Sequence, residues 1–359
     1  MARYADLVEE AILTLPQQNV TWIPKRINLS IAHRLPSWLP SAVITWLNHL
    51  WMALSVGPRS SRQAATLVHV LDGSFGYLVS RIPHDVAVAT VHDLIPLIQR
   101  EFFSKNESIS WLAAALFKKT QVGLDSCAAL IADSESTRTD LDRLMNVARE
   151  KVEVIQIALG PEFSCNQTIS FDLGGSGATP YVLHVGNNAW YKNREGVVRI
   201  FSQFAQDCDV RLVLAGPPPS ASLGRVIKYS GVAERVEVVT DPEDAALQRL
   251  YAKASVFLFP SLYEGYGWPP LEAMALGCPV VCSTAASLPE VVGDAALTAP
   301  PEDEDALANH CRAALTQPEL GKRLSEQGRE RAEQFTIERM GRELVAVYER
   351  ALERSASSD

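Results

Sequence analysis

Two glutamates flank a glycine-containing loop that begins where an apolar strand pattern ends. Glu264 and Glu272 bracket this loop, which holds Gly265 and Gly267 and follows the strand pattern Val256–Phe259. Glycine lets the backbone approach a ligand closely, and N–H groups at a helix start attract an anion. Carboxylates beside them can accept hydrogen bonds from sugar or ribose hydroxyls. The arrangement could hold a pyrophosphate or an electron-rich sugar, but these residues taken alone are more often a purely structural capped helix start.

The elements around the loop must position both carboxylates. Pro269 and Pro270 suit a first helical turn, so the sequence predicts a helix over Pro269–Leu276. Glu264 then lies in the loop and Glu272 near the helix start. Both side chains can project into the same cleft.

The rest of the chain alternates β-branched runs with helical patterns, which is typical of a parallel α/β sheet. The expected strands are Val20–Ile23, Thr66–Val70, Val86–Val91, Ala128–Ala132, Val152–Ile155, Tyr181–Val185, Val210–Ala215, Val236–Val239, Val256–Phe259 and Pro279–Cys282. The expected helices are Tyr4–Leu15, Trp111–Cys127, Ser136–Met145, Arg194–Ala205, Ala245–Lys253 and Pro269–Leu276. A last helical pattern covers Pro318–Ser355, with an interruption near Phe335.

A glycine-rich stretch divides the chain. With 359 residues the chain suits two domains, and Ser164–Pro180 is its clearest linker. We therefore expect a first domain over 1–165, a linker over 166–180, a second domain over 181–335 and a terminal helix over 336–359. Ligands of such doubly wound sheets bind at the carboxyl ends of the strands.

Composition excludes several classes of function. The net charge of −9 argues against sequence-independent nucleic-acid binding, which needs a basic face. The six cysteines show no paired CxxC spacing, so we expect no metal site and a reducing cytoplasm. The polar N-terminus does not read as a signal peptide. Trp38–Val56 is too polar for a membrane span. Its tryptophans are expected to lie on a buried face or between helices, with a peripheral contact at the inner face of the membrane as the alternative.

The loop and its surroundings resemble a known family. The string Ser261–Ala275 resembles the E-x7-E pattern of the retaining glycosyltransferase family four, and the likeness continues through Gly277–Val281 and Leu288–Asp294. The resemblance implies the GT-B fold, in which two Rossmann-like domains face each other across a cleft. It also implies that the C-terminal helix returns to the first domain.

The resemblance assigns roles on the donor side. It implies that Lys192 meets the donor phosphates, that Glu264 positions the sugar and that Glu272 binds the ribose. Many relatives carry arginine at the position of Asn187, so Arg194 is a candidate for completing the cationic clamp. The donor-binding residues implied are Gly186, Asn187, Lys192, Gly216, Val239, Glu264, Gly265, Tyr266, Gly267, Leu271 and Glu272.

The first domain carries a second likeness. Thr90–Pro96 resembles the His-Asp-Leu-x-Pro motif of a branch rich in mannosyltransferases, which implies that His92 reaches the transferring sugar. A structural role is the alternative for a histidine at a strand end. Asp93 is expected to orient the loop, and Arg138 to contact a phosphate or the acceptor. Ser134 is expected to cap the following helix.

These likenesses imply a metal-independent hexosyltransferase that needs no cofactor. It would move a hexose, with mannose favoured, from GDP-mannose or another nucleoside diphosphate sugar to a hydroxyl of a saccharide or lipid-linked acceptor. The setting would be surface polysaccharide or glycan biosynthesis, with His92, Glu264 and Lys192 as the catalytic residues. The family's first strand and glycine loop have no counterpart before Tyr4. The alternatives are therefore a catalytically impaired GT-B protein that binds a nucleotide sugar or a partner, and a GT-B epimerase. The oligomeric state stays open.

Overall fold

The computed structural model describes residues 2–15, 51, 65–82, 84–102, 111–163 and 179–356. Two compact units divide the chain: unit 1 comprises Met1–Ile157 and Ile337–Asp359, and unit 2 comprises Ala158–Thr336. The sequence placed these boundaries at 165 and 335. The expected strand Val20–Ile23 lies outside the described residues, as do most of Trp38–Val56 and of Ser164–Pro180. The other expected strands are present, with ends that shift by at most two residues.

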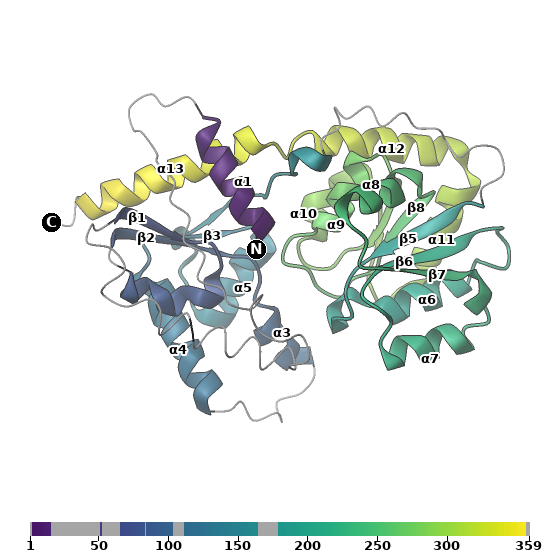
Figure 1. The fold of residues 1–359 in the computed structure, drawn as a ribbon, viewed down its shortest axis with the longest axis horizontal. Helices are drawn as coiled ribbons and strands as arrows, with labels where there is room; N and C mark the ends of the chain where they lie inside the picture. The colour runs from purple at the N-terminus through teal and green to yellow at the C-terminus, as the bar shows by residue number, and fades with distance from the viewer. Residues whose placement is uncertain are drawn as a thin grey trace. The chain divides into compact units, whose positions relative to one another are not determined.

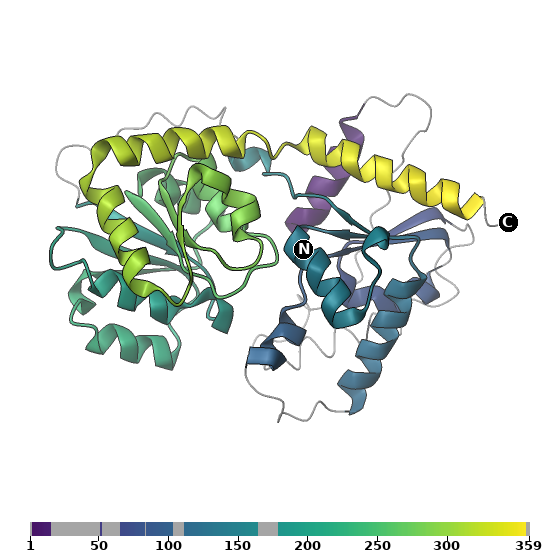
Figure 2. The ribbon, with the colours of Figure 1, turned by 180° about the vertical axis from the view of Figure 1, so that it is seen from behind.

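Unit 1 is built on a parallel four-stranded sheet. Its strands are β1 (Ala65–Val70), β2 (His84–Val91), β3 (Ala129–Ala132) and β4 (Val152–Val154), paired in that order. Its helices are α1 (Ala2–Leu13), α3 (Ile95–Phe102), α4 (Trp111–Ser126), α5 (Glu135–Met145) and α13 (Ile337–Ala356), with 3-10 turns η2 (Gly73–Arg81) and η3 (Arg149–Lys151). Figures 1 and 2 show α1 and α13 on one face of this sheet and α4 and α5 on the other. Cover on both faces explains the apolar strands.

The C-terminal helix α13 belongs to unit 1, which confirms the expected return to the first domain. Its buried stripe repeats at helical spacing through Met340, Leu344, Val347 and Ala351. Gly341 lets α13 approach α1, because a Cβ at this position would collide with the carbonyl oxygen of Ala11.

Unit 2 is built on a parallel six-stranded sheet in the order β10-β9-β8-β5-β6-β7. Its strands are β5 (Tyr181–Val185), β6 (Arg211–Gly216), β7 (Val236–Thr240), β8 (Val256–Phe259), β9 (Val280–Ser283) and β10 (Leu297–Ala299). The chain starts at the centre with β5, runs outward to β7, then crosses to β8 and runs outward the other way. The strand order reverses between β5 and β8, and ligands of such sheets bind at the carboxyl ends of the strands at such a reversal.

Helices cover both faces of the second sheet. They are α6 (Arg194–Ser202), α7 (Ala221–Tyr229), α8 (Asp244–Lys253), α9 (Trp268–Ala275), α10 (Leu288–Val292), α11 (Glu304–Thr316) and α12 (Pro318–Ala332), with 3-10 turns η4 (Pro161–Phe163), η5 (Trp190–Lys192), η6 (Ala233–Arg235) and η7 (Gly293–Ala295). Figure 1 shows α6 and α7 on the face opposite α8 and α9. The helical pattern that ends the sequence is split into α12 and α13, as expected. Within the described ranges, no helix has the length and apolar character that a membrane span requires.

Candidate active site

The predicted residues of unit 2 gather where the order of its strands reverses. Gly186 follows β5, Gly216 ends β6 and Glu264 lies in the loop after β8. Val239 lies one strand further out, near the end of β7. Because all six strands run parallel, these positions share one edge of the sheet.

Lys192 and Glu264 form an ion pair at this edge. The Lys192 Nζ donates to both carboxylate oxygens of Glu264, at 2.8 and 3.0 Å. Their side chains are only 13% and 8% exposed. The ammonium also lies 5.0 Å from the centre of the Phe259 ring. Low exposure leaves the attraction weakly screened, so the two groups hold each other in place, and a bound anion would meet a cation already positioned.

The loop from Glu264 to α9 depends on glycine. Gly267 precedes α9 with a φ of +123°, which residues with a side chain rarely adopt. A Cβ there would also lie 3.0 Å from the Cδ2 of Leu288. Gly265 and Tyr266 are buried within the loop. The helix begins at Trp268, close to the predicted start.

Glu272 lies on α9 and is only 4% exposed. The hydroxyl of Tyr251, on α8, donates to its carboxylate at 3.0 Å. Leu271, beside it, is completely buried in the core. Sequence reasoning missed Tyr251, because nothing in the spacing connects a tyrosine of one helix with a glutamate of the next.

A buried histidine lies beneath the Gly186 turn. The Nδ1 of His184 is 3.0 Å from the carbonyl oxygen of Leu258. A carbonyl only accepts, so Nδ1 carries the proton and Nε2 is an acceptor, with no partner among the described residues. Burial, aided by the charges of Arg194 and Lys192, lowers the pKa of His184 to about 3, so the ring is neutral. A Cβ at Gly186 would lie 3.0 Å from this Nε2, which explains the glycine.

Arg194 braces the turn after β5. Its guanidinium donates to Asn188 Oδ1 at 2.6 Å and to the carbonyl oxygen of Pro217 at 3.0 Å. Asn187 accepts from the N–H of Ala189 at 2.9 Å through its own Oδ1. Both residues therefore make contacts within the loop, and a role of Arg194 in the cationic clamp stays a prediction.

Gly216 has a φ of +139°. A Cβ there would collide with the carbonyl oxygen of Gly186. The glycines at the ends of β5 and β6 thus let the two loops pack directly against each other.

In unit 1, His92 follows β2 and both of its ring nitrogens are occupied. Nδ1 lies 2.6 Å from Asp133 Oδ2, and Nε2 lies 2.8 Å from the carbonyl oxygen of Leu71. Burial opposes protonation, but the charge and hydrogen bond of Asp133 outweigh it and raise the pKa of His92 to about 9. The ring is therefore an imidazolium that donates from both nitrogens. Sequence reasoning assigned no role to Asp133, because only the pairing of β2 with β3 brings it to His92.

Three further residues singled out in the sequence make local contacts near His92, and the expected contact of Arg138 with a phosphate or the acceptor stays a prediction. Asp93 accepts from the N–H of Ile95 at 2.9 Å and so orients the loop before α3. Ser134 caps α5 by accepting from the N–H of Thr137 at 3.1 Å, as predicted. Arg138 pairs with Glu135 at 2.5 Å, one turn away on the same helix.

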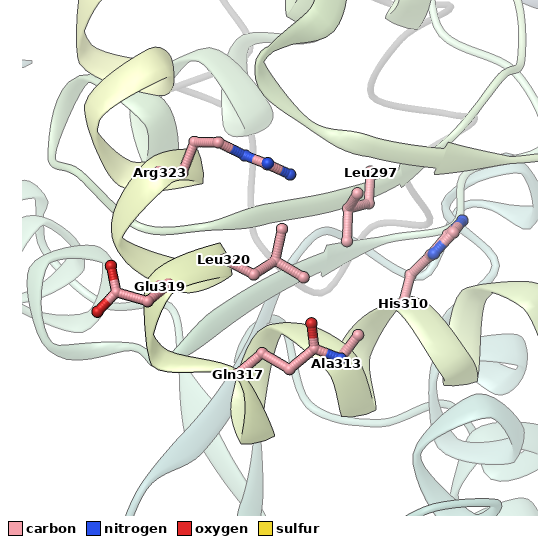
Figure 3. A pocket seen from close by; sticks show the side chains of 7 residues that line it. All are labelled: Leu297, His310, Ala313, Gln317, Glu319, Leu320 and Arg323. Carbon is pink, nitrogen blue, oxygen red and sulfur yellow. The ribbon is translucent and has the colours of Figure 1, made fainter.

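A surface pocket of about 650 Å³ lies elsewhere in unit 2 (Figure 3). It is lined by Leu297, His310, Ala313, Gln317, Glu319, Leu320 and Arg323. Leu297 begins β10, so the pocket adjoins the amino end of that strand, opposite the edge that carries the predicted residues. Across the described ranges, no three His, Cys, Asp or Glu side chains are placed to hold a metal ion.

Sequence comparisons point to one family. Residues 166–331 match the family described as Glycosyl transferases group 1. O-antigen chain mannosyltransferase B of Escherichia coli is 28% identical over 291 residues, 78% of this chain and 74% of that protein. The MMP alpha-(1->4)-mannosyltransferase of Mycolicibacterium hassiacum is 38% identical over 143 residues, 39% of this chain and 35% of that protein. The serotype-specific mannosyltransferase WbdA of Escherichia coli is 26% identical over 301 residues, 80% of this chain and 36% of that protein.

Solved structures share the fold. A sucrose-phosphate synthase from Thermosynechococcus elongatus aligns with a TM-score of 0.66 at 22% identity, covering 79% of this chain and 73% of that one. WaaG, a glycosyltransferase involved in lipopolysaccharide biosynthesis, aligns with a TM-score of 0.65 at 14% identity, covering 86% and 83%. Anabaena HepE in complex with UDP and glucose aligns with a TM-score of 0.62 at 17% identity, covering 79% and 78%. This chain therefore has the GT-B fold, and its residues 166–331 match the Glycosyl transferases group 1 family.

Proposed function

We propose that this protein transfers a hexose, with mannose favoured, from a nucleoside diphosphate sugar to a hydroxyl of a saccharide or lipid-linked acceptor, with retention of the anomeric configuration. The observation that carries the proposal is the Lys192–Glu264 pair at the strand reversal of the group 1 domain. A relative named as an O-antigen chain mannosyltransferase supports mannose and a polysaccharide setting, and one named as a serotype-specific mannosyltransferase also supports mannose. A structural neighbour that holds UDP and glucose supports the class of donor.

Three side chains on the donor side have different roles. The Lys192 ammonium stabilises the charge that develops on the departing diphosphate, where a preformed cation is most effective. Glu264 accepts hydrogen bonds from the sugar, and Glu272 accepts them from the ribose. Because the donor carries the activated sugar and Lys192 supplies positive charge, the proposed reaction uses neither a cofactor nor a metal ion.

The acceptor proton passes to the departing phosphate, so the step needs no protein base. The carbon–oxygen bond to the phosphate breaks as the bond to the acceptor oxygen forms on the same face of the sugar. His92 is the residue proposed for the sugar side. As an imidazolium with both N–H groups engaged, it fixes the ends of β1, β2 and β3 and places a positive charge there. It does not exchange a proton. A lipid-linked acceptor would bring the enzyme to the inner face of a membrane.

The test is incubation of the purified protein with GDP-mannose or UDP-glucose, with and without EDTA. We expect release of the nucleoside diphosphate from one donor, unaffected by EDTA, and a product whose anomeric configuration by NMR matches that of the donor. An inverted product would contradict retention. Nucleotide binding with neither transfer nor donor hydrolysis would instead favour a GT-B protein that binds without catalysing, and a changed sugar still joined to its nucleotide would favour an epimerase.

A further inference from the structure

Ser287 directly precedes α10, yet its hydroxyl does not cap that helix. A serine at this position usually has extended backbone angles and accepts a hydrogen bond from an N–H of the first turn. Ser134 and Ser220 do so, on α5 and α7. Ser287 has a φ of −76° and a ψ of −11°, which are helical angles, and its hydroxyl points elsewhere.

The hydroxyl is directed at the loop that joins Glu264 to α9. Ser287 Oγ lies 2.5 Å from the carbonyl oxygen of Tyr266 and 2.9 Å from that of Glu264. Ser287 is completely buried. A single O–H shared between two carbonyl oxygens fixes the direction of both.

The direction of a carbonyl sets the direction of the next N–H. In a trans peptide the C=O and the following N–H point opposite ways. The amides of Gly265 and Gly267 therefore point away from Ser287. Leu288, the first residue of α10, packs close to where a Cβ of Gly267 would lie. Ser287 and Leu288 therefore both contact the loop.

We propose that Ser287 is a positioning residue for catalysis: its hydroxyl holds the backbone of Glu264–Tyr266 so that the Glu264 carboxylate and the loop amides face the sugar and the departing phosphate. This inference rests on the proposed function. The position of the loop and the contact with the ribose depend on different residues, because Glu272 is held by Tyr251 and not by Ser287. Loss of the Ser287 hydroxyl should therefore slow the reaction without weakening binding of the nucleoside.

The experiment compares Ser287→Ala with Ser287→Thr, which keeps the hydroxyl. The matched control is Ser230→Ala, whose hydroxyl donates to the carbonyl oxygen of Ile227 at 2.7 Å just after α7. Since α7 starts at the carboxyl end of β6, its far end lies at the opposite edge of the sheet. Two quantities are measured: kcat for nucleoside diphosphate release from the donor that the wild type uses, and Kd for the matching nucleoside monophosphate.

We expect Ser287→Ala to lower kcat by about 10-fold or more while Kd for the monophosphate stays within about twofold. Ser287→Thr should recover most of the rate, and Ser230→Ala should change neither quantity. If Ser287→Thr is poorly folded by circular dichroism, Ser287→Cys takes its place as the variant that keeps a donor. An unchanged kcat in Ser287→Ala, or an equal loss of monophosphate affinity, would overturn the positioning role while the proposed function stands. A wild type that neither binds nor cleaves either donor would overturn both.

Discussion

At the scale of single residues, the site is a set of nearly buried polar groups that hold one another. Lys192 is held by Glu264, and Glu272 by Tyr251. A buried charge without its partner is strongly unfavourable, so each group depends on the other for stability as well as for position. Stability measurements can therefore probe this site before the acceptor is identified.

Glu264→Gln removes a charge and leaves the shape of the side chain. The Lys192 ammonium then stays in a poorly hydrated place without its counter-ion. We expect the free energy of unfolding to fall by about 3 kcal/mol in urea titrations, together with loss of donor turnover. The control is Glu237→Gln, which breaks the exposed pair with Arg211 and should cost less than about 1 kcal/mol. Equal losses in the two variants would contradict a buried pair.

Tyr251→Phe removes only the hydroxyl that holds Glu272. We expect the affinity for the nucleoside diphosphate to weaken about tenfold by isothermal titration, an effect of about 1.4 kcal/mol. Tyr181→Phe is the matched control. Tyr181 lies at the amino end of β5, and its hydroxyl donates to the carbonyl oxygen of Leu250 at 2.7 Å. Similar weakening in both variants would count against a specific role for Tyr251.

At the scale of elements, His92 joins the ends of three strands of unit 1. The ring follows β2, and its two nitrogens bind Leu71 after β1 and Asp133 after β3. The helices beside this sheet are joined in a different way. α1 and α13 approach each other closely at the small residues Ala11 and Gly341, so their packing depends on shape at this point.

The His92 contact predicts a pH dependence. The pKa of His92 is about 9 in the folded chain and about 6.5 in an unfolded one, so the folded chain keeps a proton that the unfolded chain loses. The stabilisation is complete below about pH 6.5 and is lost as the pH rises through about 9. The free energy of unfolding in urea should be higher for the wild type than for His92→Gln. This difference should be up to about 3 kcal/mol larger at pH 6 than at pH 9.5. A difference that does not vary with pH would refute the imidazolium.

Gly341→Ala tests the contact of α1 with α13. The added methyl group would press on the backbone of Ala11, and we expect about 1–3 kcal/mol of destabilisation by thermal or urea unfolding. The matched change is Gly224→Ala on α7, where nothing lies within 4 Å of the new Cβ. There the gain in helix propensity should stabilise the protein by about 0.5–1 kcal/mol. Changes of the same sign in both variants would be inconsistent with this packing.

At the scale of the whole molecule, the two units differ in how their strands are ordered. Among the described residues, the strands of unit 1 follow one another in sequence, whereas those of unit 2 reverse between β5 and β8. Ligands of such sheets bind where the strand order reverses, and the donor site is therefore proposed in unit 2. The chain passes from unit 1 to unit 2 after Ile157 and returns at Ile337.

Much of this organisation could be predicted from the sequence, because it depends on local patterns. The loop after β8, the prolines of α9 and the serine cap of α5 are each specified within a few residues. Apolar runs located the strands other than β10, whose three residues include neither valine nor isoleucine, whereas the equally short β4 contains two valines. The broken helix at the C-terminus was visible because the apolar repeat is interrupted.

The contacts that the sequence could not reveal join residues distant in the chain. Asp133 reaches His92 across 41 positions, and Ser287 reaches the carbonyl oxygen of Glu264 across 23. No periodic pattern encodes such pairs, because they arise only when parallel strands bring their ends together. His92 shows the same limit: its position was predicted, but the protonated ring with both nitrogens engaged depends on partners from two other strands.

The proposed function requires that the strand reversal in unit 2 holds the donor nucleotide through Glu272. The most direct test is the dissociation constant of GDP and of UDP for the wild type and for Glu272→Ala, with Glu237→Ala as an exposed control in the same unit. We predict that the wild type binds at least one of the two, that Glu272→Ala weakens this binding by about tenfold or more, and that Glu237→Ala leaves it unchanged. Equal affinity of the wild type and Glu272→Ala would contradict the account.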